Sequence, residues 1–244
     1  MAKVFLIEDD DLISNAVQEY FSISGLDIEV FNRIDLVRQA LKHQEPDLII
    51  LDIMLPDGNG FFFTKELREN SNVPVIFLTA RDEESDRIMG FEVGGDDYVI
   101  KPFSIKELFL RVKALLRRSN GGQDTPAAAT AGKSEWFLGN HCLQIDYQAR
   151  KVFIDDQEIS LTTSEWNLLT YLSIRPEQAV SRDILLGECL GYLYRCSERT
   201  IDTHIANLRN HLGEGGWIET IRGFGYRFAG NPVDSVISEK NSQG

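Results

Sequence analysis

The segment Pro46–Gly58, with the sequence PDLIILDIMLPDG, constrains the fold of this chain more than any other. Its residues Leu48–Leu51 are apolar without alternation, which is typical of a parallel strand covered on both faces. Asp52 follows directly, and the turn residues Pro56–Gly58 prevent the strand from continuing. We therefore expect Asp52 at the carboxyl edge of a parallel sheet, where open α/β sheets hold their ligands. Taken alone, an acid in this position is more often a turn former or a helix cap.

Strand-like apolar segments alternate with helical patterns through the first half of the chain. The expected strands are Lys3–Ile7, Ile28–Phe31, Leu48–Leu51, Val73–Leu78 and Tyr98–Ile100. The expected helices are Leu12–Phe21, Ile34–Leu41, Phe61–Leu67, Ile88–Val93 and Ile105–Leu116. This alternation predicts an α/β fold with a doubly wound, five-stranded parallel sheet. We expect the flavodoxin-like strand order 2-1-3-4-5.

The composition changes after Arg118. The segment Ser119–Ser134 is rich in Gly, Ala, Ser and Thr, which predicts a flexible linker. A small antiparallel sheet is expected from Phe137–Leu138, Leu143–Ile145, Val152–Ile154 and Ile159–Leu161. Helices are expected after a cap at Thr162 or Thr163, after a cap at Ser181, and over Thr200–Leu212. A hairpin of Trp217–Ile221 and Tyr226–Phe228 follows, and the polar tail after Asn231 is expected to be disordered.

The composition excludes several classes of protein. No apolar run approaches the roughly 18 residues of a membrane helix, and acids follow the N-terminus too early for a signal peptide. We therefore expect a cytoplasmic protein without membrane contact. The net charge of −13 argues against non-specific coating of nucleic acid, although it can hide a local basic patch. Cys142, Cys189 and Cys196 show neither a disulfide framework nor a zinc pattern, so structural thiols are expected.

Polar residues with complementary chemistry follow the other strands of the predicted sheet. Glu8 and Asp9 end the first strand, Thr79 ends the fourth, and Lys101 ends the fifth, all on the same edge as Asp52. Three crowded carboxylates repel one another unless a divalent cation lies among them, and Mg²⁺ suits such oxygen ligands. A metal, an ammonium and a hydroxyl are what the transfer of a phosphoryl group to a carboxylate nucleophile needs.

Several groups of residues, in the expected order and spacing, resemble the receiver domain of two-component response regulators. They are Glu8-Asp9, Leu51–Gly58, Leu78–Arg81 and Gly95–Phe103. The resemblance continues into Ser181-Arg182, Arg199–Ile205 and Ile221–Phe228, which look like the winged helix-turn-helix effector of the OmpR/PhoB class. It implies a receiver domain over 1–118, a linker over 119–134, an α+β winged-helix DNA-binding domain over 135–230 and a disordered tail over 231–244.

The resemblance also implies roles for the residues at the sheet edge. Asp52 would accept phosphate from a histidine kinase, with Lys101 and Thr79 contacting the phosphoryl group. Asp9, Asp52 and the backbone carbonyl of Met54 would bind Mg²⁺, and Glu8 would act through water. Thr79 would move inward on phosphorylation, and Tyr98 would occupy the space it leaves. The chain has glycine at both 94 and 95, where the family usually has Gly-Ala. We expect the extra glycine, Gly95, to loosen the turn before the fifth strand.

A phosphorylated homodimer and a DNA complex are further implications of the resemblance. The dimer would pair Arg87 with Glu107, Asp97 with Arg111 and Glu92 with Lys113, although such charges are often only solvated. A recognition helix and a wing would read promoter DNA, and RNA polymerase is an expected partner. The candidate DNA contacts are Arg199, Thr200, Thr203, His204, Asn207, Arg209, Arg222, Tyr226 and Arg227. Asn207 is either an exposed helical residue or a bidentate contact to an adenine edge.

Two other classes of function remain open. An aspartyl-phosphate phosphatase would be expected to carry Asp-x-Asp at the nucleophile, where this chain has Asp52-Ile53-Met54. A phosphorelay protein without DNA binding would lack the segment Arg222–Phe228. The sequence therefore favours a transcription factor that phosphorylation activates, rather than an enzyme.

Overall fold

The computed structural model describes residues 1–80, 84–119, 132–191 and 198–232. Its contacts divide the chain into two compact units, Met1–Asn120 and Gly121–Gly244. Most of the expected linker, most of the expected tail, Arg81 and Cys196 lie outside the described residues. Within the described residues, no helix has both the length and the apolar character needed to cross a membrane.

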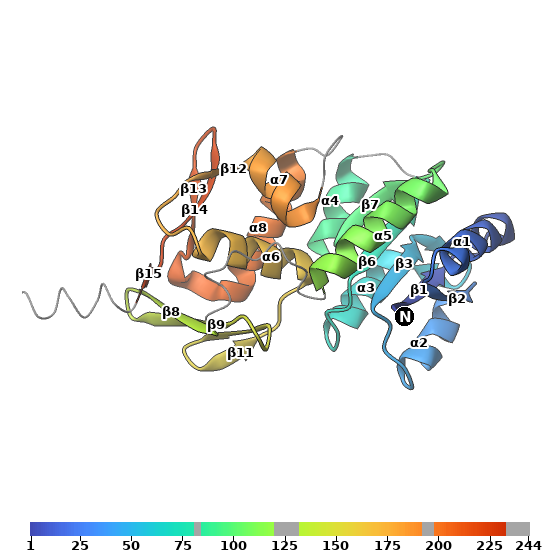
Figure 1. The fold of residues 1–244 in the computed structure, drawn as a ribbon, viewed down its shortest axis with the longest axis horizontal. Helices are drawn as coiled ribbons and strands as arrows, with labels where there is room; N and C mark the ends of the chain where they lie inside the picture. The colour runs from blue at the N-terminus through green and yellow to red at the C-terminus, as the bar shows by residue number, and fades with distance from the viewer. Residues whose placement is uncertain (81–83, 120–131, 192–197, 233–244) are drawn as a thin grey trace, which may run out of the picture. The chain divides into compact units, whose positions relative to one another are not determined.

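The first unit is a parallel sheet with helices on both faces (Figure 1). Its long strands are β1 (Lys3–Ile7), β2 (Asp27–Phe31), β3 (Leu48–Asp52), β6 (Val75–Thr79) and β7 (Asp97–Ile100). Its helices are α1 (Asp11–Ile23), α2 (Ile34–Leu41), α3 (Gly60–Arg68), α4 (Glu84–Glu92) and α5 (Ile105–Ser119). The strand order is β2-β1-β3-β6-β7, which confirms the predicted order 2-1-3-4-5.

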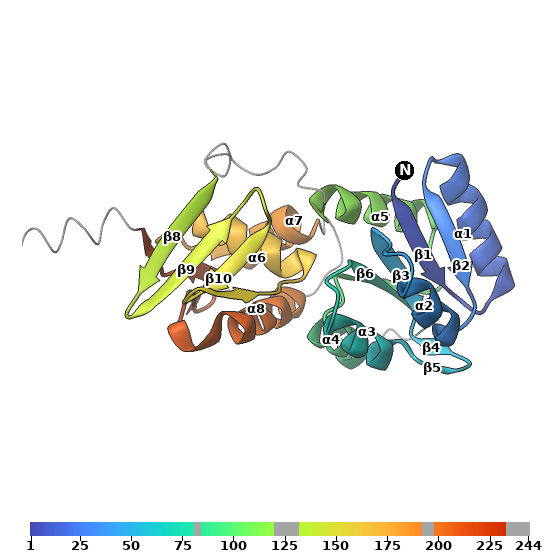
Figure 2. The same ribbon diagram turned by 90° about the horizontal axis from the view of Figure 1, so that it is seen from below.

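The apolar run of β3 is buried on both faces of the sheet, as its lack of alternation predicted. Leu48 and Ile50 pack with residues of α1 and α5 such as Val17 and Leu108. Ile49 and Leu51 face the opposite way, into a second core with residues of α2, α3 and α4. Figure 2 shows α1 and α5 on one side of the sheet and α2, α3 and α4 on the other. Asp52 is the last residue of β3, so the strand carries it to the edge of both cores.

The turn after Asp52 contains a short hairpin that the sequence did not indicate. Strand β4 (Met54–Leu55) pairs with β5 (Gly58–Asn59) in a short hairpin. Asp57 at its tip accepts hydrogen bonds from the amides of Ile34 and Asp35, at 3.1 and 3.0 Å, and so caps α2 from a distant part of the chain. Partial burial raises the pKa of Asp57, but these bonds outweigh it and hold the pKa below its usual value.

Gly95 is tightly packed, which corrects the expectation that it loosens the turn before the last strand. A Cβ at this position would lie 2.5 Å from the ring of Phe77 and 2.8 Å from the carbonyl oxygen of Gly90. The preceding Gly94 has a positive φ of 95°, and its carbonyl oxygen accepts hydrogen bonds from Arg68 at 2.8 and 3.0 Å. Gly95 is therefore required because Phe77 fills the space that a side chain would need.

The second unit combines an antiparallel sheet, three helices and a smaller sheet. The first sheet has the order β11-β10-β9-β8-β15 and the second the order β12-β14-β13. The strands are β8 (Lys133–Leu138), β9 (His141–Asp146), β10 (Lys151–Ile154), β11 (Gln157–Ile159), β12 (Val180–Ser181), β13 (Ile218–Ile221), β14 (Gly225–Phe228) and β15 (Asn231–Pro232). The helices are α6 (Thr163–Ser173), α7 (Arg182–Leu190) and α8 (Glu198–Leu212), with a 3₁₀ turn at Gly213–Gly215.

The ordered part of the second unit extends slightly beyond the limits expected for the effector domain. Strand β8 begins at Lys133, inside the segment expected to be a linker. Strand β15 pairs with β8, although residues after 230 were expected to be disordered. Strand β8 is distant from Asn231–Pro232 in the sequence, so the local composition of these two residues did not indicate that they form a strand.

The caps predicted for the second unit are present. Thr162 and Glu165 form a reciprocal capping box at the start of α6, and Ser181 caps α7 through the amide of Ile184. Residues of α6, α7 and α8 form one core with residues of the large sheet such as Leu143 and Val152. Figure 2 shows these three helices beside the sheet. Cys189 is buried there and Cys142 is half-buried, both as free thiols.

Candidate functional site

Three carboxylates meet at the carboxyl edge of the parallel sheet. Glu8 and Asp9 follow β1, Asp52 ends β3, and oxygen atoms of all three lie within 4.8 Å of one another. Glu8 is 1% exposed and Asp52 is 6% exposed, whereas Asp9 is open to solvent. The predicted set of acids is thus brought together with two members buried and one accessible. An all-oxygen donor set of this kind is compatible with a small divalent cation.

Lys101 supplies a positive charge to the same site from the end of β7. Its Nζ lies 2.5 Å from Asp52 Oδ2 and 2.6 Å from Glu8 Oε2. Burial lowers the pKa of Lys101, but the bonds to the two carboxylates outweigh it and hold the pKa above its usual value. Burial raises the pKa of Glu8, and Lys101 opposes that shift. The ammonium therefore stays charged beside Asp52.

Met54 and Thr79 frame the same edge. The amide of Met54 donates a hydrogen bond of 2.9 Å to Asp52 Oδ1, so Asp52 also acts as the turn former that its position alone suggested. Thr79 ends β6 and is fully buried, and its carbonyl oxygen accepts a bond of 2.6 Å from the amide of Lys101. The ring of Tyr98 is buried and lies edge-on to Phe77, with centroids 6.5 Å apart.

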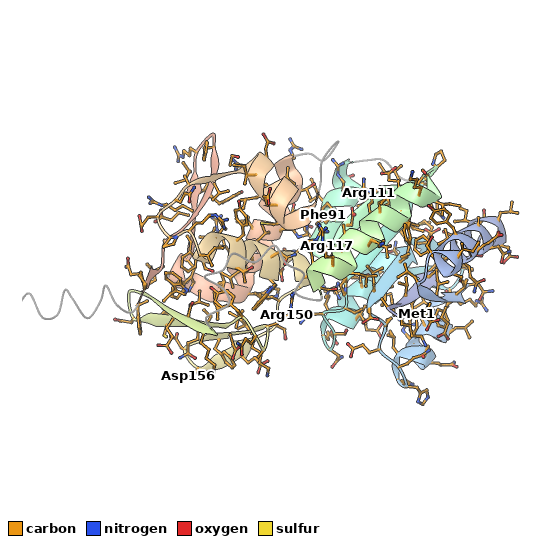
Figure 3. The ribbon with its side chains drawn as sticks, viewed as in Figure 1. Met1, Phe91, Arg111, Arg117, Arg150 and Asp156 are labelled. Carbon is orange, nitrogen blue, oxygen red and sulfur yellow. The ribbon has the colours of Figure 1, made fainter. Side chains whose placement is uncertain are left out.

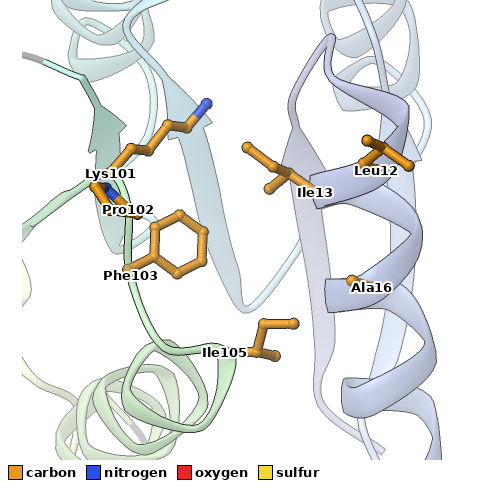
Figure 4. Close-up of a pocket in the computed structure, with 7 residues that line it drawn as sticks. All are labelled: Leu12, Ile13, Ala16, Lys101, Pro102, Phe103 and Ile105. Carbon is orange, nitrogen blue, oxygen red and sulfur yellow. The ribbon is translucent and has the colours of Figure 1, made fainter.

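An apolar cavity of about 460 Å³ opens beside Lys101 (Figure 4). It is lined by Leu12, Ile13, Ala16, Lys101, Pro102, Phe103 and Ile105, from the start of α1 and the segment between β7 and α5. Leu12 is largely exposed. This cavity could not be predicted from the sequence, because its residues come from opposite ends of the unit and meet only in the folded domain.

The charged residues expected on one face of α4, β7 and α5 are partly paired within the chain. Arg111, labelled in Figure 3, lies 3.2 Å from Asp97 and 2.9 Å from Glu107. The ammonium of Lys113 lies over the ring of Phe109, 5.4 Å from its centroid. Arg87 is half-buried and Glu92 is exposed. The same three elements also expose the apolar side chains of Met89, Ile100 and Leu110.

Helix α8 of the second unit divides the candidate DNA contacts into exposed and buried residues. Arg199, Ala206 and Asn210 are exposed, and Thr203 and Asn207 are half-buried. Thr200 and His204, which are also candidate DNA contacts, are each 1% exposed and face the core. Helical spacing places them one position away from residues that face solvent, and the sequence alone did not fix the rotation of the helix.

Several candidates near the hairpin of β13 and β14 are engaged within the chain. Arg209 donates bonds of 3.0 and 2.7 Å to the carbonyl oxygen of Ile218, and a bond of 2.9 Å to Thr220. Tyr226, another candidate DNA contact, is buried. Arg227 pairs with Glu219 at 2.5 Å. Arg222, between the two strands, is exposed.

Comparison with known proteins places this geometry in a family. Residues 4–113 match the family described as the response regulator receiver domain, and residues 156–228 match the C-terminal domain of transcriptional regulatory proteins. The uncharacterized transcriptional regulatory protein YclJ of Bacillus subtilis (strain 168) is 38% identical over 93% of this chain and 98% of its own length. The chain is a response regulator of the OmpR/PhoB class.

Further comparisons agree with this response-regulator family. The transcriptional regulatory protein SrrA of Staphylococcus aureus (strain NCTC 8325 / PS 47) is 36% identical over 93% of this chain and 95% of its own length. A solved structure of a RitR mutant covers 95% of this chain and all of that chain, with a TM-score of 0.71 and 22% identity, which shows a shared fold. The first unit is a receiver domain and the second a winged-helix DNA-binding domain.

The family fixes the general activity of this response regulator. It is a transcription regulator that phosphorylation activates and that binds DNA, with a kinase as its phosphate source. We call α8 the recognition helix and the hairpin of β13 and β14 the wing. Arg182 and Asp202 lie within family motifs of the sequence that did not indicate a role for them, and in the structure their side chains lie 2.7 Å apart.

The buried His204 makes the stability of the winged-helix domain depend on pH. Burial lowers its pKa from 6.5 to about 4, and the nearby Glu165 opposes the shift. Between these values the unfolded chain binds more protons than the folded one, so the free energy of unfolding falls as the pH falls. His211 acts in the opposite sense, because Glu165, 3.3 Å away, raises its pKa. Its contribution is complete below pH 6.5 and is lost as the pH rises through its higher folded pKa.

We expect His204→Gln to flatten the acid dependence of this domain. In the wild type, the loss approaches about 1.4 kcal/mol per pH unit between pH 6.5 and 4, and glutamine cannot take up the proton. Urea unfolding at pH 7 and pH 5 measures this, because all three tryptophans, Trp136, Trp166 and Trp217, report on this unit. His43→Gln, a change in the receiver domain, is the control. An equally steep loss in His204→Gln would contradict the assignment.

Proposed function

We propose that Asp52 is the phosphate acceptor of this response regulator and that a histidine kinase is its donor. The observation that carries the proposal is the Asp52 carboxylate at the sheet edge, held by Lys101 and flanked by Glu8 and Asp9. In the transfer, an Asp52 oxygen forms a bond to phosphorus and the phosphorus–nitrogen bond of the phosphohistidine breaks. The electron pair of that bond stays with the imidazole, and Lys101 stabilises the charge on the phosphoryl oxygens.

Mg²⁺ is the cofactor that the acidic cluster fits. Asp9, Asp52 and the backbone carbonyl of Met54 would hold it, with Glu8 acting through water. When bound, the metal would offset the negative charge of the incoming phosphoryl oxygens. The exposure of Asp9 leaves a solvent route for the ion, and the buried Glu8 and Asp52 provide fixed charge. Asp9→Ala is expected to weaken this site, because one of few carboxylate ligands is lost.

The phosphoryl group would act on the receiver domain through Thr79 and Tyr98. Phosphorylation adds about −1.5 to −2 charges and new acceptor oxygens beside Asp52. Thr79 ends β6, the strand that pairs with β3, and we propose that its hydroxyl responds to the phosphoryl group. Tyr98 already packs inward against Phe77, and we propose that phosphorylation favours this inward state over an outward one.

The cavity beside Lys101 is our proposed contact surface for the kinase. A phosphohistidine must approach Asp52 closely, and the exposed Leu12 and the wall of Ile13 and Phe103 lie next to this approach. Apolar residues around a polar reaction centre suit an amphipathic helix that carries the histidine between apolar side chains.

The face of α4, β7 and α5 is our proposed dimer interface in the phosphorylated protein. Its charged residues are Arg87, Glu92, Asp97, Glu107, Arg111 and Lys113. Exposed ion pairs contribute only about 0 to 1 kcal/mol each, so apolar burial must contribute the rest. Met89, Ile100 and Leu110 are exposed on the same elements and supply it. Arg111 would exchange its partners within the chain for partners across the interface.

Leu110→Glu is expected to weaken the phosphorylated dimer about tenfold or more, because it places an unpaired charge in an apolar contact. Sedimentation with acetyl phosphate and Mg²⁺ measures the change. Leu36→Glu is the matched control, because Leu36 is 43% exposed on α2 and Leu110 is 56% exposed on α5. If both variants dimerise as the wild type does, this face is not the interface.

We propose that the dimer binds promoter DNA in the cytoplasm and contacts RNA polymerase. We propose a receiver domain over 1–118, followed by a linker and an effector domain. The linker was expected over 119–134 and the effector from 135, but strands β8 and β15 extend the effector to include Lys133 and Pro232. Arg199, Thr203 and Asn207 on the recognition helix and Arg222 in the wing are the proposed DNA contacts. Dimerisation on two half-sites raises the affinity that one weakly charged module provides.

The proposal is tested by selection of duplexes from a random-sequence pool by the full chain. With acetyl phosphate and Mg²⁺ we expect enrichment of paired half-sites, and a weaker enrichment without phosphodonor. Equal enrichment under both conditions would separate DNA binding from phosphorylation. Enrichment of no sequence under either condition would contradict sequence-specific binding.

A further inference from the structure

We propose that Asp202 is a positioning residue that fixes the angle between the recognition helix and the wing. In this role it binds no DNA, but it lets the helix and the wing engage the same duplex together. The inference rests on the DNA-binding function proposed above. A carboxylate on a helix that binds DNA is otherwise unexpected, because the phosphates repel it. The positioning role gives a reason for its presence.

Asp202 connects three elements at one oxygen atom. Its Oδ1 accepts a hydrogen bond of 2.6 Å from the hydroxyl of Tyr226, which lies on wing strand β14. The same oxygen accepts a bond of 2.7 Å from Nε of Arg182, the first residue of α7. The bond from Arg182 is charge-assisted, and both are short for their type. The recognition helix is thereby tied to the wing and to the neighbouring helix.

The ring of Tyr226 is also held by two guanidinium groups. That of Arg182 lies 5.0 Å from the ring centroid and that of Arg209 lies 5.6 Å from it. Arg209 belongs to the recognition helix, and its bonds to Ile218 and Thr220 reach the other wing strand, β13. Each wing strand therefore has its own side-chain connection to the recognition helix. Burial and the bond to Asp202 raise the pKa of Tyr226 to about 12, so its hydroxyl stays protonated and remains a donor.

Backbone hydrogen bonds attach the wing to α7, whereas the recognition helix is joined to wing strand β13 along the chain through the turn at Gly213–Gly215. Strand β14 pairs with β12 at Ser181, and the amide of Arg182 donates a bond of 3.3 Å to the carbonyl oxygen of Phe224. Strand β12 leads directly into α7, so this pairing sets the wing against α7. Side chains connect α8 to the other wing strand, β14, and to α7: Asp202 accepts hydrogen bonds from Tyr226 of β14 and from Arg182 of α7.

This arrangement accounts for the use of positive charge near the DNA surface. Arg182 donates to Asp202, and Arg209 donates to Ile218 and Thr220, so both guanidinium groups are engaged within the domain. Two binding elements that are held at the right spacing bind a duplex with a high effective concentration, and the advantage is lost when their relative geometry varies. We infer that these arginines contribute to DNA affinity through geometry instead of phosphate contacts.

The test is a double-mutant cycle on a duplex that the wild type enriches from the random pool. Arg222→Ala removes the exposed wing cation, and we expect it to weaken binding about tenfold in the wild type. In an Asp202→Ala background we expect Arg222→Ala to weaken binding less than twofold, because the wing no longer engages. Asp202→Asn keeps the Oδ1 acceptor and should restore most of the effect of Arg222→Ala. If Arg222→Ala costs the same factor in both backgrounds, Asp202 is not a positioning residue.

Two further variants separate positioning from charge and from folding. Asp183→Ala removes an exposed carboxylate from the first turn of α7 and changes the net charge equally, so it should leave the effect of Arg222→Ala intact. Tyr226→Phe removes only the hydroxyl and serves if Asp202→Ala does not fold; we expect it to reduce the effect of Arg222→Ala as well. A full tenfold effect in Tyr226→Phe would overturn the inference. A wild type that enriches no duplex would instead refute the DNA-binding proposal.

Discussion

Asp52→Asn is expected to abolish phosphorylation of the full chain by acetyl phosphate and Mg²⁺, with a loss of initial rate on the order of 100-fold or more. The amide is not the nucleophile that a carboxylate is, and it cannot form the same acyl phosphate. The substitution keeps an oxygen that can accept from the amide of Met54, which in the wild type donates to Asp52 Oδ1 at 2.9 Å. Lys101 retains Glu8 as a partner at 2.6 Å, so the receiver domain should fold.

Mass spectrometry of the intact protein measures this reaction, because one added phosphoryl group is resolved directly. Asp35→Asn is the control, because Asp35 lies exposed on α2, pairs with Arg38 and leaves the sheet edge unchanged. It should be phosphorylated as fast as the wild type. Labelling of Asp52→Asn at the wild-type rate would place the acceptor elsewhere, and Glu8 or Asp9 would become the residues to test.

Gly225→Ala is expected to destabilise the winged-helix domain by about 3 kcal/mol, at the upper end of the usual cost of overpacking. A Cβ at this position would lie 2.0 Å from the carbonyl oxygen of Val180 and 2.9 Å from Cα of Ser181. Both neighbours belong to the backbone of β12, so no side chain can rotate away. Strands β12 and β14 would have to separate, which also breaks the attachment of the wing to α7.

Thermal unfolding followed by tryptophan fluorescence measures this effect, and a fall in the midpoint of about 15 °C is expected for a domain of this size. Gly187→Ala is the matched control. Gly187 lies inside α7 with open space where a methyl group would stand, so alanine should stabilise the helix by up to about 1 kcal/mol. Phosphorylation of Asp52 should be unchanged in both variants. An unchanged midpoint for Gly225→Ala would show that the strands tolerate separation.

Much of the receiver domain follows from local sequence. The apolar run Leu48–Leu51 predicted a doubly covered strand, and its alternate residues do enter two cores on opposite faces. The carboxyl ends of parallel strands lie at one edge of a sheet, so residues that follow different strands could be predicted to lie close together. Glu8, Asp9, Asp52 and Lys101 are brought together for this reason. Their chemical roles remain proposals that the phosphorylation experiment tests.

The rotation of the recognition helix could not be predicted from the sequence, for a physical reason. Helical periodicity identified α8, but it did not fix which side of the helix packs on the core, and Thr200 and His204 proved to be buried. An arginine near a DNA surface looks the same in sequence whether it binds phosphate or a neighbouring strand. Arg209 is engaged with Ile218 because the wing returns to the helix from nine residues away.

The sequence by itself determined the strand order, the sheet edge that holds the acids and the change of fold after the linker. These depend on hydrophobic periodicity and on chain direction, which are properties of short segments. The tertiary structure decided that Asp57 caps a distant helix, that Phe77 leaves room only for glycine at position 95, and that Asp202 joins the recognition helix to the wing. Each of these contacts depends on segments that are far apart in the chain and meet only in the folded domain. The local sequence around each residue therefore carries no indication of the contact.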